Sequence, residues 1–132
     1  MALLVADAAE AVMLANILNK TAPQNLLLKL YTNDYTPVEG ETEASYTEAA
    51  GFGYAALTLT GANWTITPGA PSLASYAQQT FTFSGALGLV YGYFVVQAVS
   101  GLIMWGERFT DGPYTIAQAE DQIRINPSLS LT

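Results

Sequence analysis

The sequence predicts a mainly β protein: an antiparallel β-sandwich, with a jelly-roll among its candidate arrangements, and one N-terminal α-helix. Most of the chain consists of short apolar runs in which every second residue is hydrophobic, which is the period of a β-strand. The runs recur at intervals of about ten residues and are joined by glycine, proline and asparagine, as in sandwiches and barrels. A chain of 132 residues is long enough for one domain with its own core.

A segment with helical periodicity spans residues 7–19. Alanine and leucine dominate it, and both favour helices intrinsically. Asp7 suits the first turn because its charge opposes the positive end of the helix dipole, and Pro23 lies just beyond the end. One apolar stripe of this helix is formed by Ala8, Val12, Ala15 and Leu18. The helix is therefore expected to dock against another surface.

Strands are expected from residue 25 onward, where the hydrophobic period changes from about 3.6 to 2. Besides the hairpin described below, they are expected at residues 26–31, 54–59, 64–66, 77–84 and 123–131. Pro127 interrupts the last run, and because proline cannot donate a backbone hydrogen bond we expect it at a sheet edge or a bulge. The prediction divides the chain into a helical arm, residues 1–24, and a β-sandwich domain, residues 25–132.

A hairpin is expected at residues 90–109, with Ser100 and Gly101 as a two-residue turn that pairs Val96 with Trp105. One face then carries Phe94, Val96, Ala98, Ile103 and Trp105, which suit a core. The opposite face carries Val95, Val99, Leu102 and Met104. A solvated sheet face should be polar, and this second face is apolar. We therefore expect the N-terminal helix or a neighbouring subunit to cover it.

The composition argues against catalysis. The chain has no histidine and no cysteine, and its four basic residues are Lys20, Lys29, Arg108 and Arg124. General-base, nucleophilic and soft-metal chemistry near neutral pH therefore lack their usual groups. A net charge of −7 disfavours nucleic acid and anionic lipid as partners. The uncharged segment 85–105 is better explained by two strands than by a membrane span, since it is rich in valine and tyrosine and contains a turn signal. We expect no enzyme, no cofactor, no metal and no nucleic-acid or membrane partner.

Two groups of carboxylates are candidate sites. The first lies in the irregular segment 33–53 and comprises Asp34, Glu39, Glu41, Glu43 and Glu48. Their spacing matches no calcium-loop pattern, so a solvated, mobile loop is favoured over a cation site. The second comprises Glu107, Asp111, Glu120 and Asp121, near predicted strand ends. A facing pair of them would suit glycoside hydrolysis, but acids in such places more often form turns and caps.

The eight tyrosines and two tryptophans raise a different candidate, a platform on which sugar rings stack. Against it, Trp64 and Trp105 are in phase with buried positions of their strands. Tyrosine is equally favoured on strands and at protein–protein interfaces. Sugar binding is therefore kept as an alternative.

Six short segments carry a resemblance to a known class of proteins. They are residues 28–37 (LKLYTNDYTP), 46–48 (YTE), 53–55 (GYA), 59–64 (LTGANW), 90–95 (VYGYFV) and 105–109 (WGERF). The series resembles small structural proteins that tailed bacteriophages encode among their virion genes. It extends from about Val12 to the end of the chain and consists of strand and turn residues, without a catalytic motif. The resemblance implies a non-enzymatic virion component, a decoration or cement protein on the capsid exterior.

That resemblance also implies partners. A decoration protein would self-associate as a dimer or trimer and bind the major capsid protein. The low charged fraction, 11%, is compatible because it leaves apolar surface to be covered. We expect a contact surface formed by Ala8, Val12, Ala15, Leu18, Val95, Val99, Leu102 and Met104. Packing of the helix on the hairpin within one copy is an equal alternative for these eight residues. Rival functions are a tail or head–tail connector component and a carbohydrate-binding module for host attachment.

Overall fold

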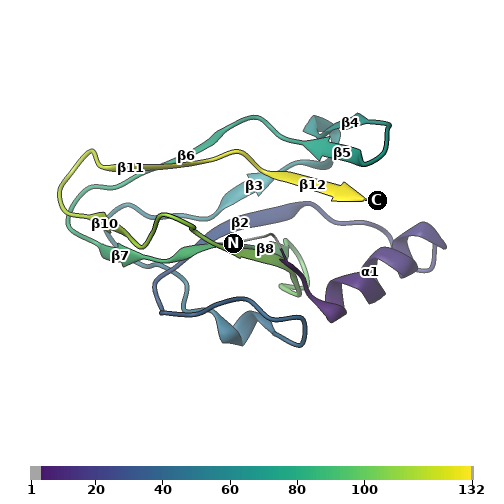
Figure 1. Ribbon diagram of the computed structural model, residues 1–132, viewed down its shortest axis with the longest axis horizontal. Helices are drawn as coiled ribbons and strands as arrows, with labels where there is room; N and C mark the ends of the chain where they lie inside the picture. The colour runs from purple at the N-terminus through teal and green to yellow at the C-terminus, as the bar shows by residue number, and fades with distance from the viewer. Residues whose placement is uncertain (1–3, 132) are drawn as a thin grey trace.

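The computed structural model describes residues 4–131 and is shown in Figure 1. Short strands joined by turns make up most of it, as the period-2 pattern predicts. The elements are β1 (Leu4–Val5), α1 (Asp7–Ile17), β2 (Leu26–Tyr31), β3 (Leu57–Leu59), β4 (Thr65–Thr67), β5 (Ser72–Ser75), β6 (Gln79–Thr82), β7 (Gly88–Val90), β8 (Gly92–Gln97), β9 (Ile103–Arg108), β10 (Tyr114–Ile116), β11 (Gln122–Ile125) and β12 (Ser128–Leu131), with 3₁₀ turns at Glu43–Ser45 and Gly61–Asn63.

All strand pairs are antiparallel, and the strands form two layers (Figure 1). One layer contains a five-stranded sheet in the order β1-β9-β8-β2-β3, and the pair β7–β10 continues β8 and β9. The other layer contains the sheet β12-β5-β4, which the pair β6–β11 continues. The predicted fold class, a mainly β antiparallel protein with one helix, is confirmed.

The main core lies between the two layers. The five-stranded sheet contributes Leu28 and Leu30 from β2 and Tyr93 and Val95 from β8. The facing layer contributes Phe81, Phe83, Ile123 and Ile125, and α1 contributes Ala9. Every residue of β8 is buried, which explains why its sequence shows no alternation of apolar and polar residues.

A second cluster covers the other face of the five-stranded sheet. Tyr46, from the segment between β2 and β3, stacks on Phe94 of β8 at 4.4 Å between ring centroids and contacts Tyr31 edge to face. Gly106 of β9 lies beneath the Tyr46 ring, where a Cβ atom would overlap it.

The sequence pattern assigned the face with Phe94, Val96 and Ile103 to the core and predicted the helix or a neighbouring subunit on the opposite face. In the structure the opposite face, with Val95 and Met104, packs in the main core, to which α1 also contributes. Most of the cover on the face with Phe94 comes from the irregular segment of the same chain.

The β8–β9 hairpin differs from its prediction by one residue. Val95, not Val96, pairs with Trp105, and the next pair is Val96 with Ile103, so Met104 is an extra residue in a β-bulge. Residues 98–101 form the turn, with Gly101 at a φ of +75°. The predicted two-residue turn was therefore wrong. Because of the bulge, Trp105 faces the main core while Ile103 packs in the second cluster, although both were predicted on one face.

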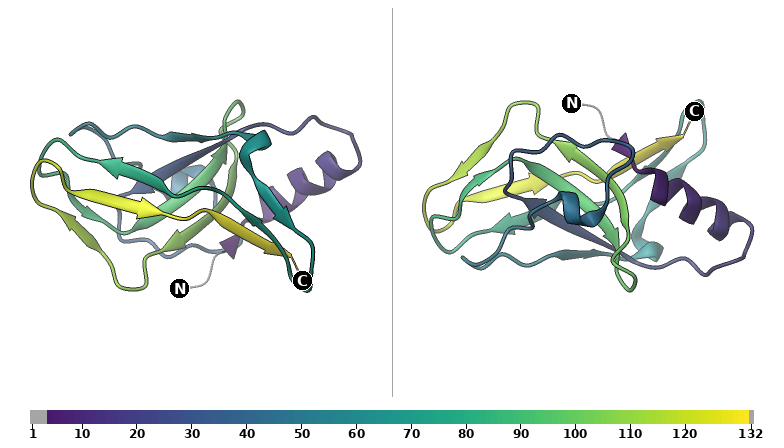
Figure 2. Two further views of the ribbon diagram at one scale, coloured as in Figure 1. Left: turned by 90° about the horizontal axis from the view of Figure 1, so that it is seen from above. Right: turned by 90° about the horizontal axis from the view of Figure 1, so that it is seen from below.

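Helix α1 ends at Ile17, two residues before its predicted end. Asn19 takes the left-handed conformation at a φ of +56°, and the N–H of Lys20 then donates to the carbonyl of Ala15 at 2.8 Å. Asp7 occupies the first turn, as expected. The helix packs against β9 and lies at one end of the molecule, as both views in Figure 2 show.

Pro127 divides the last predicted strand into β11 and β12. Pro127 itself belongs to neither strand: it lies between them, directly before β12, which is an outer strand of its sheet. The Pro127 carbonyl accepts a hydrogen bond from the N–H of Tyr76 at 3.0 Å. The segment between β11 and β12 therefore stays paired with the segment between β5 and β6.

Candidate functional site

The end of the molecule that carries the second half of α1 is almost free of charge, whereas Asp7 and Glu10 lie in the first turn of the helix. Four segments meet there, namely 14–26, 61–75, 97–105 and 127–131, and they contain a single charged residue, Lys20. The whole chain has a net charge of −7, so its carboxylates lie elsewhere. We call this region the uncharged end.

Exposed apolar side chains gather on the same segments. Of the ten large hydrophobic side chains that are exposed among the described residues, seven belong to the uncharged end: Leu14, Ile17, Leu18, Ile66, Leu73, Val99 and Leu131. Ile17 and Val99 are 78% and 86% exposed. Apolar side chains grouped in this way, on a protein with few charges, are typical of a surface that another protein covers.

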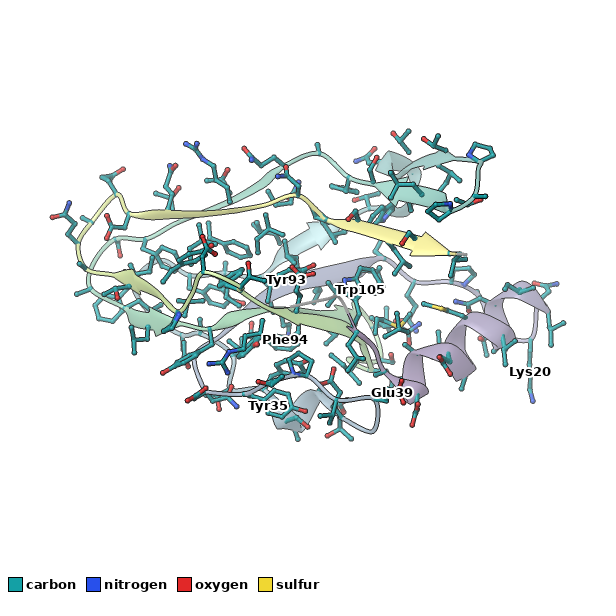
Figure 3. The ribbon with its side chains drawn as sticks, viewed as in Figure 1. Lys20, Tyr35, Glu39, Tyr93, Phe94 and Trp105 are labelled. Carbon is teal, nitrogen blue, oxygen red and sulfur yellow. The ribbon has the colours of Figure 1, made fainter. Side chains whose placement is uncertain are left out.

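The exposed stripe of α1 has charges at its two ends. Glu10, Leu14 and Ile17 follow at spacings of four and three residues and therefore lie on one face of the helix. Glu10 lies in the first turn, and Lys20 follows shortly after the last turn. Figure 3 shows the Lys20 side chain extending away from the rest of the molecule. The stripe is thus acidic at its start, apolar in its middle and basic at its end.

The structure brings four of the eight predicted contact residues together. Ala8, Val12 and Ala15 of α1 and Leu102 of the hairpin line one shallow surface depression. This arrangement corresponds to the alternative in which helix and hairpin meet within one copy.

The other four predicted contact residues are separated. Leu18 and Val99 are exposed at the uncharged end and are available to a partner. Val95 and Met104 are buried in the main core, so they stabilise the fold of a single copy.

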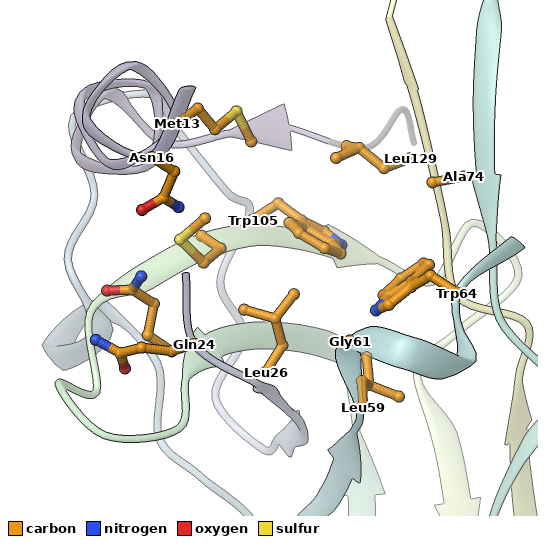
Figure 4. Close-up of a pocket in the computed structure, with 12 residues that line it drawn as sticks. Met13, Asn16, Gln24, Leu26, Leu59, Gly61, Trp64, Ala74, Trp105 and Leu129 are labelled. Carbon is orange, nitrogen blue, oxygen red and sulfur yellow. The ribbon is translucent and has the colours of Figure 1, made fainter. Parts of the chain in front are cut away.

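A cavity of about 230 Å³ opens between α1 and the two layers (Figure 4). Both tryptophans line it, together with Met13, Met104 and Leu129. Three primary amides also line it, those of Asn16, Gln24 and Gln97. Figure 4 shows Asn16 and Gln24 on one side of the cavity and Trp64 and Leu129 on the other. Sequence reasoning did not find this cavity, because its residues come from six separate segments.

Four of the five acids of segment 33–53 are exposed, as the sequence predicted, and Glu41 is the exception. Glu41 is buried and accepts hydrogen bonds from the hydroxyl groups of Tyr46, at 2.6 Å, and Tyr35, at 3.1 Å. Figure 3 shows Tyr35 and Phe94 in this region below the sheet. Burial, and then the hydrogen bond and charge of Glu41, raise the pKa of Tyr46 far above its ordinary value, so Tyr46 stays a donor.

Two ion pairs attach the same segment to the sheet. Lys29 of β2 lies 3.1 Å from Glu48, and Arg108 of β9 lies 2.6 Å from Asp34. The acids of the segment therefore point to separate places on the sheet. Within residues 4–131 no group of three or more acidic side chains is arranged to hold a metal ion.

The second group of candidate acids is also dispersed. Asp121 accepts hydrogen bonds from the N–H groups of Ala117 and Gln118, and Asp111 accepts one from the Tyr114 hydroxyl group. These are turn contacts, as the sequence indicated. Burial raises the pKa of Glu107, yet no hydrogen bond or ion pair joins Glu107 to another acid in the described part of the chain.

The described helix α1 is too short to cross a membrane. Comparison with protein-family models, with curated proteins and with solved structures found no match for this chain.

Proposed function

We propose that this chain is a non-enzymatic structural protein of a tailed-phage virion: a decoration protein that binds the major capsid protein on the outside of the shell and associates with its own copies. The observation that supports this proposal most directly is the uncharged end, where exposed apolar side chains gather on an otherwise acidic molecule. The sequence resemblance described above supports the choice of a virion protein.

The exposed stripe of α1 is the surface best suited to contact a second copy. Glu10 and Lys20 lie five residues before and after Ala15. If two copies pack their helices antiparallel about an axis near Ala15, Glu10 of each copy faces Lys20 of the other, and the apolar middle of each stripe is covered. Two molecules of charge −7 repel each other over most of their surfaces, and the uncharged end is where that repulsion is weakest. The remaining apolar side chains of this end, Ile66, Leu73 and Leu131 on β4, β5 and β12, are then left for the shell.

The rival functions have less support in the geometry. A sugar platform needs exposed aromatic rings, whereas all eight tyrosines and both tryptophans are buried or half-buried. A connector ring needs two different surfaces that meet head to tail, and the exposed apolar side chains favour one end.

The test has two parts. Electron cryo-microscopy of the particle that carries this protein should show it outside the capsid, with α1 directed toward a neighbouring copy and β4, β5 and β12 toward the shell. In solution, Ile17→Asp should convert the purified oligomer to monomer, because it places a charge in the apolar middle of the stripe.

Leu89→Asp is the matched control, since Leu89 is an exposed leucine of β7 at the opposite end of the molecule. It should leave the mass in solution unchanged. A wild-type protein that is monomeric at high concentration, or density located in the tail, would contradict the proposal.

A further inference from the structure

The cavity between α1 and the two layers supports an inference beyond self-association. We propose that it binds one large, uncharged apolar side chain of a peptide segment, and that backbone carbonyl groups of the segment accept hydrogen bonds from the amide groups of Asn16, Gln24 and Gln97. The assignment of the segment to the capsid shell rests on the proposed function, whereas the chemistry of the site does not.

The orientation of the Gln24 amide is fixed by its neighbours. The Oε1 atom of Gln24 accepts hydrogen bonds from the N–H groups of Val99, at 2.9 Å, and Ser100, at 3.1 Å. A backbone N–H can only donate, so this atom must be the oxygen. The Oε1 atom of Gln97 accepts the hydroxyl proton of Ser100 at 2.7 Å, and the Ser100 oxygen accepts a hydrogen bond from the N–H of Leu102.

Asn16 is arranged in the same way, with its Oδ1 atom accepting from the Thr21 hydroxyl group at 3.3 Å. All three carbonyl oxygens are therefore used, and no hydrogen bond from any of the three NH₂ groups is found within residues 4–131. Gln97 is only 6% exposed. In the described part of the chain, the fully buried side-chain donor without a hydrogen-bond partner is Nε1 of Trp105, which also lines the cavity. A buried donor of this kind is stabilised when an acceptor reaches it, so the site is suited to a ligand with oxygen acceptors.

The apolar part of the site has the size of one side chain. An apolar cavity of about 150 Å³ is known to hold benzene. The 230 Å³ here has room for the side chain of leucine or for that of phenylalanine, which is slightly larger than benzene. Met13 and Met104 line the cavity, and methionine adapts its shape readily to different neighbours.

Charge favours a neutral ligand. No lysine or arginine lines the cavity, and the protein has a net charge of −7, so a carboxylate would lose its hydration without gaining a cation. The three amides come from α1, from the segment before β2 and from β8. A residue within a peptide has one backbone carbonyl group before its side chain and one after it. These two acceptors can reach amide donors on different elements, which a small molecule with one acceptor cannot do.

Blocked amino acids provide a direct probe, because both tryptophans of the chain line the cavity and report its occupancy by fluorescence. Titration of the full chain with N-acetyl-leucine methylamide or N-acetyl-phenylalanine methylamide should give a saturable change, with a dissociation constant on the order of 1 mM. N-acetyl-alanine methylamide and 3-phenylpropionate should bind at least about tenfold more weakly, since the first lacks the side chain and the second carries a charge. Absence of saturation with both large residues, or tighter binding of 3-phenylpropionate, overturns the proposal.

Variants locate the site. Gln24→Glu keeps an oxygen for Val99 and Ser100 and replaces the NH₂ donor with a second, charged carboxylate oxygen, so it should weaken binding about tenfold. Gln78→Glu adds the same charge at an exposed position outside the cavity and should change binding less than about twofold. Ala74→Leu should abolish binding by filling the cavity. Circular dichroism checks that each variant is folded, and unchanged binding to Gln24→Glu refutes the role of the amides.

The two proposals fail separately. If the blocked residues bind but the protein is absent from the capsid exterior, the cavity remains a peptide site and the decoration function is refuted. If the protein decorates the capsid but no blocked residue binds, the cavity is not a site and the shell contact lies elsewhere on the uncharged end.

Discussion

At the scale of single residues, the most informative side chain is the buried carboxylate of Glu41. A buried charge is tolerated only when hydrogen bonds replace its hydration. Glu41 receives three such bonds, from the hydroxyl groups of Tyr35 and Tyr46 and from the N–H of Val38. Tyr35 and Tyr46 also pack on the second face of the five-stranded sheet. The carboxylate of Glu41 therefore fixes both the conformation of segment 33–53 and the side chains that cover this face.

Tyr46→Phe should lower the free energy of unfolding by about 1–3 kcal/mol, because it removes a donor from a buried carboxylate while keeping the ring on Phe94. Urea unfolding followed by circular dichroism measures the change. Tyr91→Phe is the control: no hydrogen bond of the Tyr91 hydroxyl group is found in the described part of the chain, and the expected change is below about 0.5 kcal/mol. Equal effects of the two variants would show that Glu41 does not depend on Tyr46.

At the scale of elements, the hydrophobic period located the helix and most of the strands, but not their detailed pairing. Pro127 marked a real interruption because its effect on a strand is local. The bulge at Met104 left no local signal, and it moved Trp105 to the opposite face from the predicted one. Burial of Glu41 was also missed, because its cause is the tertiary meeting of Tyr35, Tyr46 and the sheet.

For the candidate site too, the sequence predicted what depends on composition and missed what depends on tertiary contacts. The low charge content predicted an apolar surface, and Leu18 and Val99 do lie on it. The cavity joins residues that are far apart in the chain, such as Asn16 and Leu129, so no periodic pattern could reveal it.

The end of α1 gives the prediction at this scale. Asn19 adopts a φ of +56°, which asparagine and glycine tolerate better than other residues. Asn19→Ala should therefore lower the free energy of unfolding by about 1 kcal/mol, whereas Asn19→Gly should leave it unchanged or raise it by a few tenths of a kcal/mol. Thermal unfolding of both variants measures the difference. An alanine variant as stable as the glycine variant would mean that the left-handed turn does not end the helix.

At the scale of the whole molecule, charge and apolar surface are separated. Nine of the eleven acids lie along the body and on the segment below the sheet, and the other two, Asp7 and Glu10, lie in the first turn of α1. The later turns of α1, the hairpin turn and the ends of β4, β5 and β12 carry exposed apolar side chains. An acidic body keeps closely arrayed copies soluble, and an uncharged end lets them meet a surface. This separation links the fold to the proposed role, because each layer of the sandwich contributes to the same end.

The buried tyrosines give the molecule a definite response to alkaline pH. Burial raises the pKa values of Tyr31, Tyr46 and Tyr93 well above the ordinary 10, so the folded state keeps their protons while the unfolded state releases them. Their contribution to stability is complete below pH 10 and is lost as the pH rises, by about 1.4 kcal/mol per pH unit for each tyrosine. Burial raises the pKa of Tyr54 as well, so four such groups together remove about 5–6 kcal/mol per pH unit. A domain of ordinary stability should therefore unfold within the few units above pH 10. Hydrogen bonds instead lower the pKa of Tyr76, which should ionise before unfolding begins. Tyrosinate absorbance should thus show a small early step, abolished by Tyr76→Phe, and then a large rise that coincides with the loss of circular dichroism. Ionisation of all eight tyrosines in one transition near pH 10, with the fold retained, would contradict the burial on which this prediction depends.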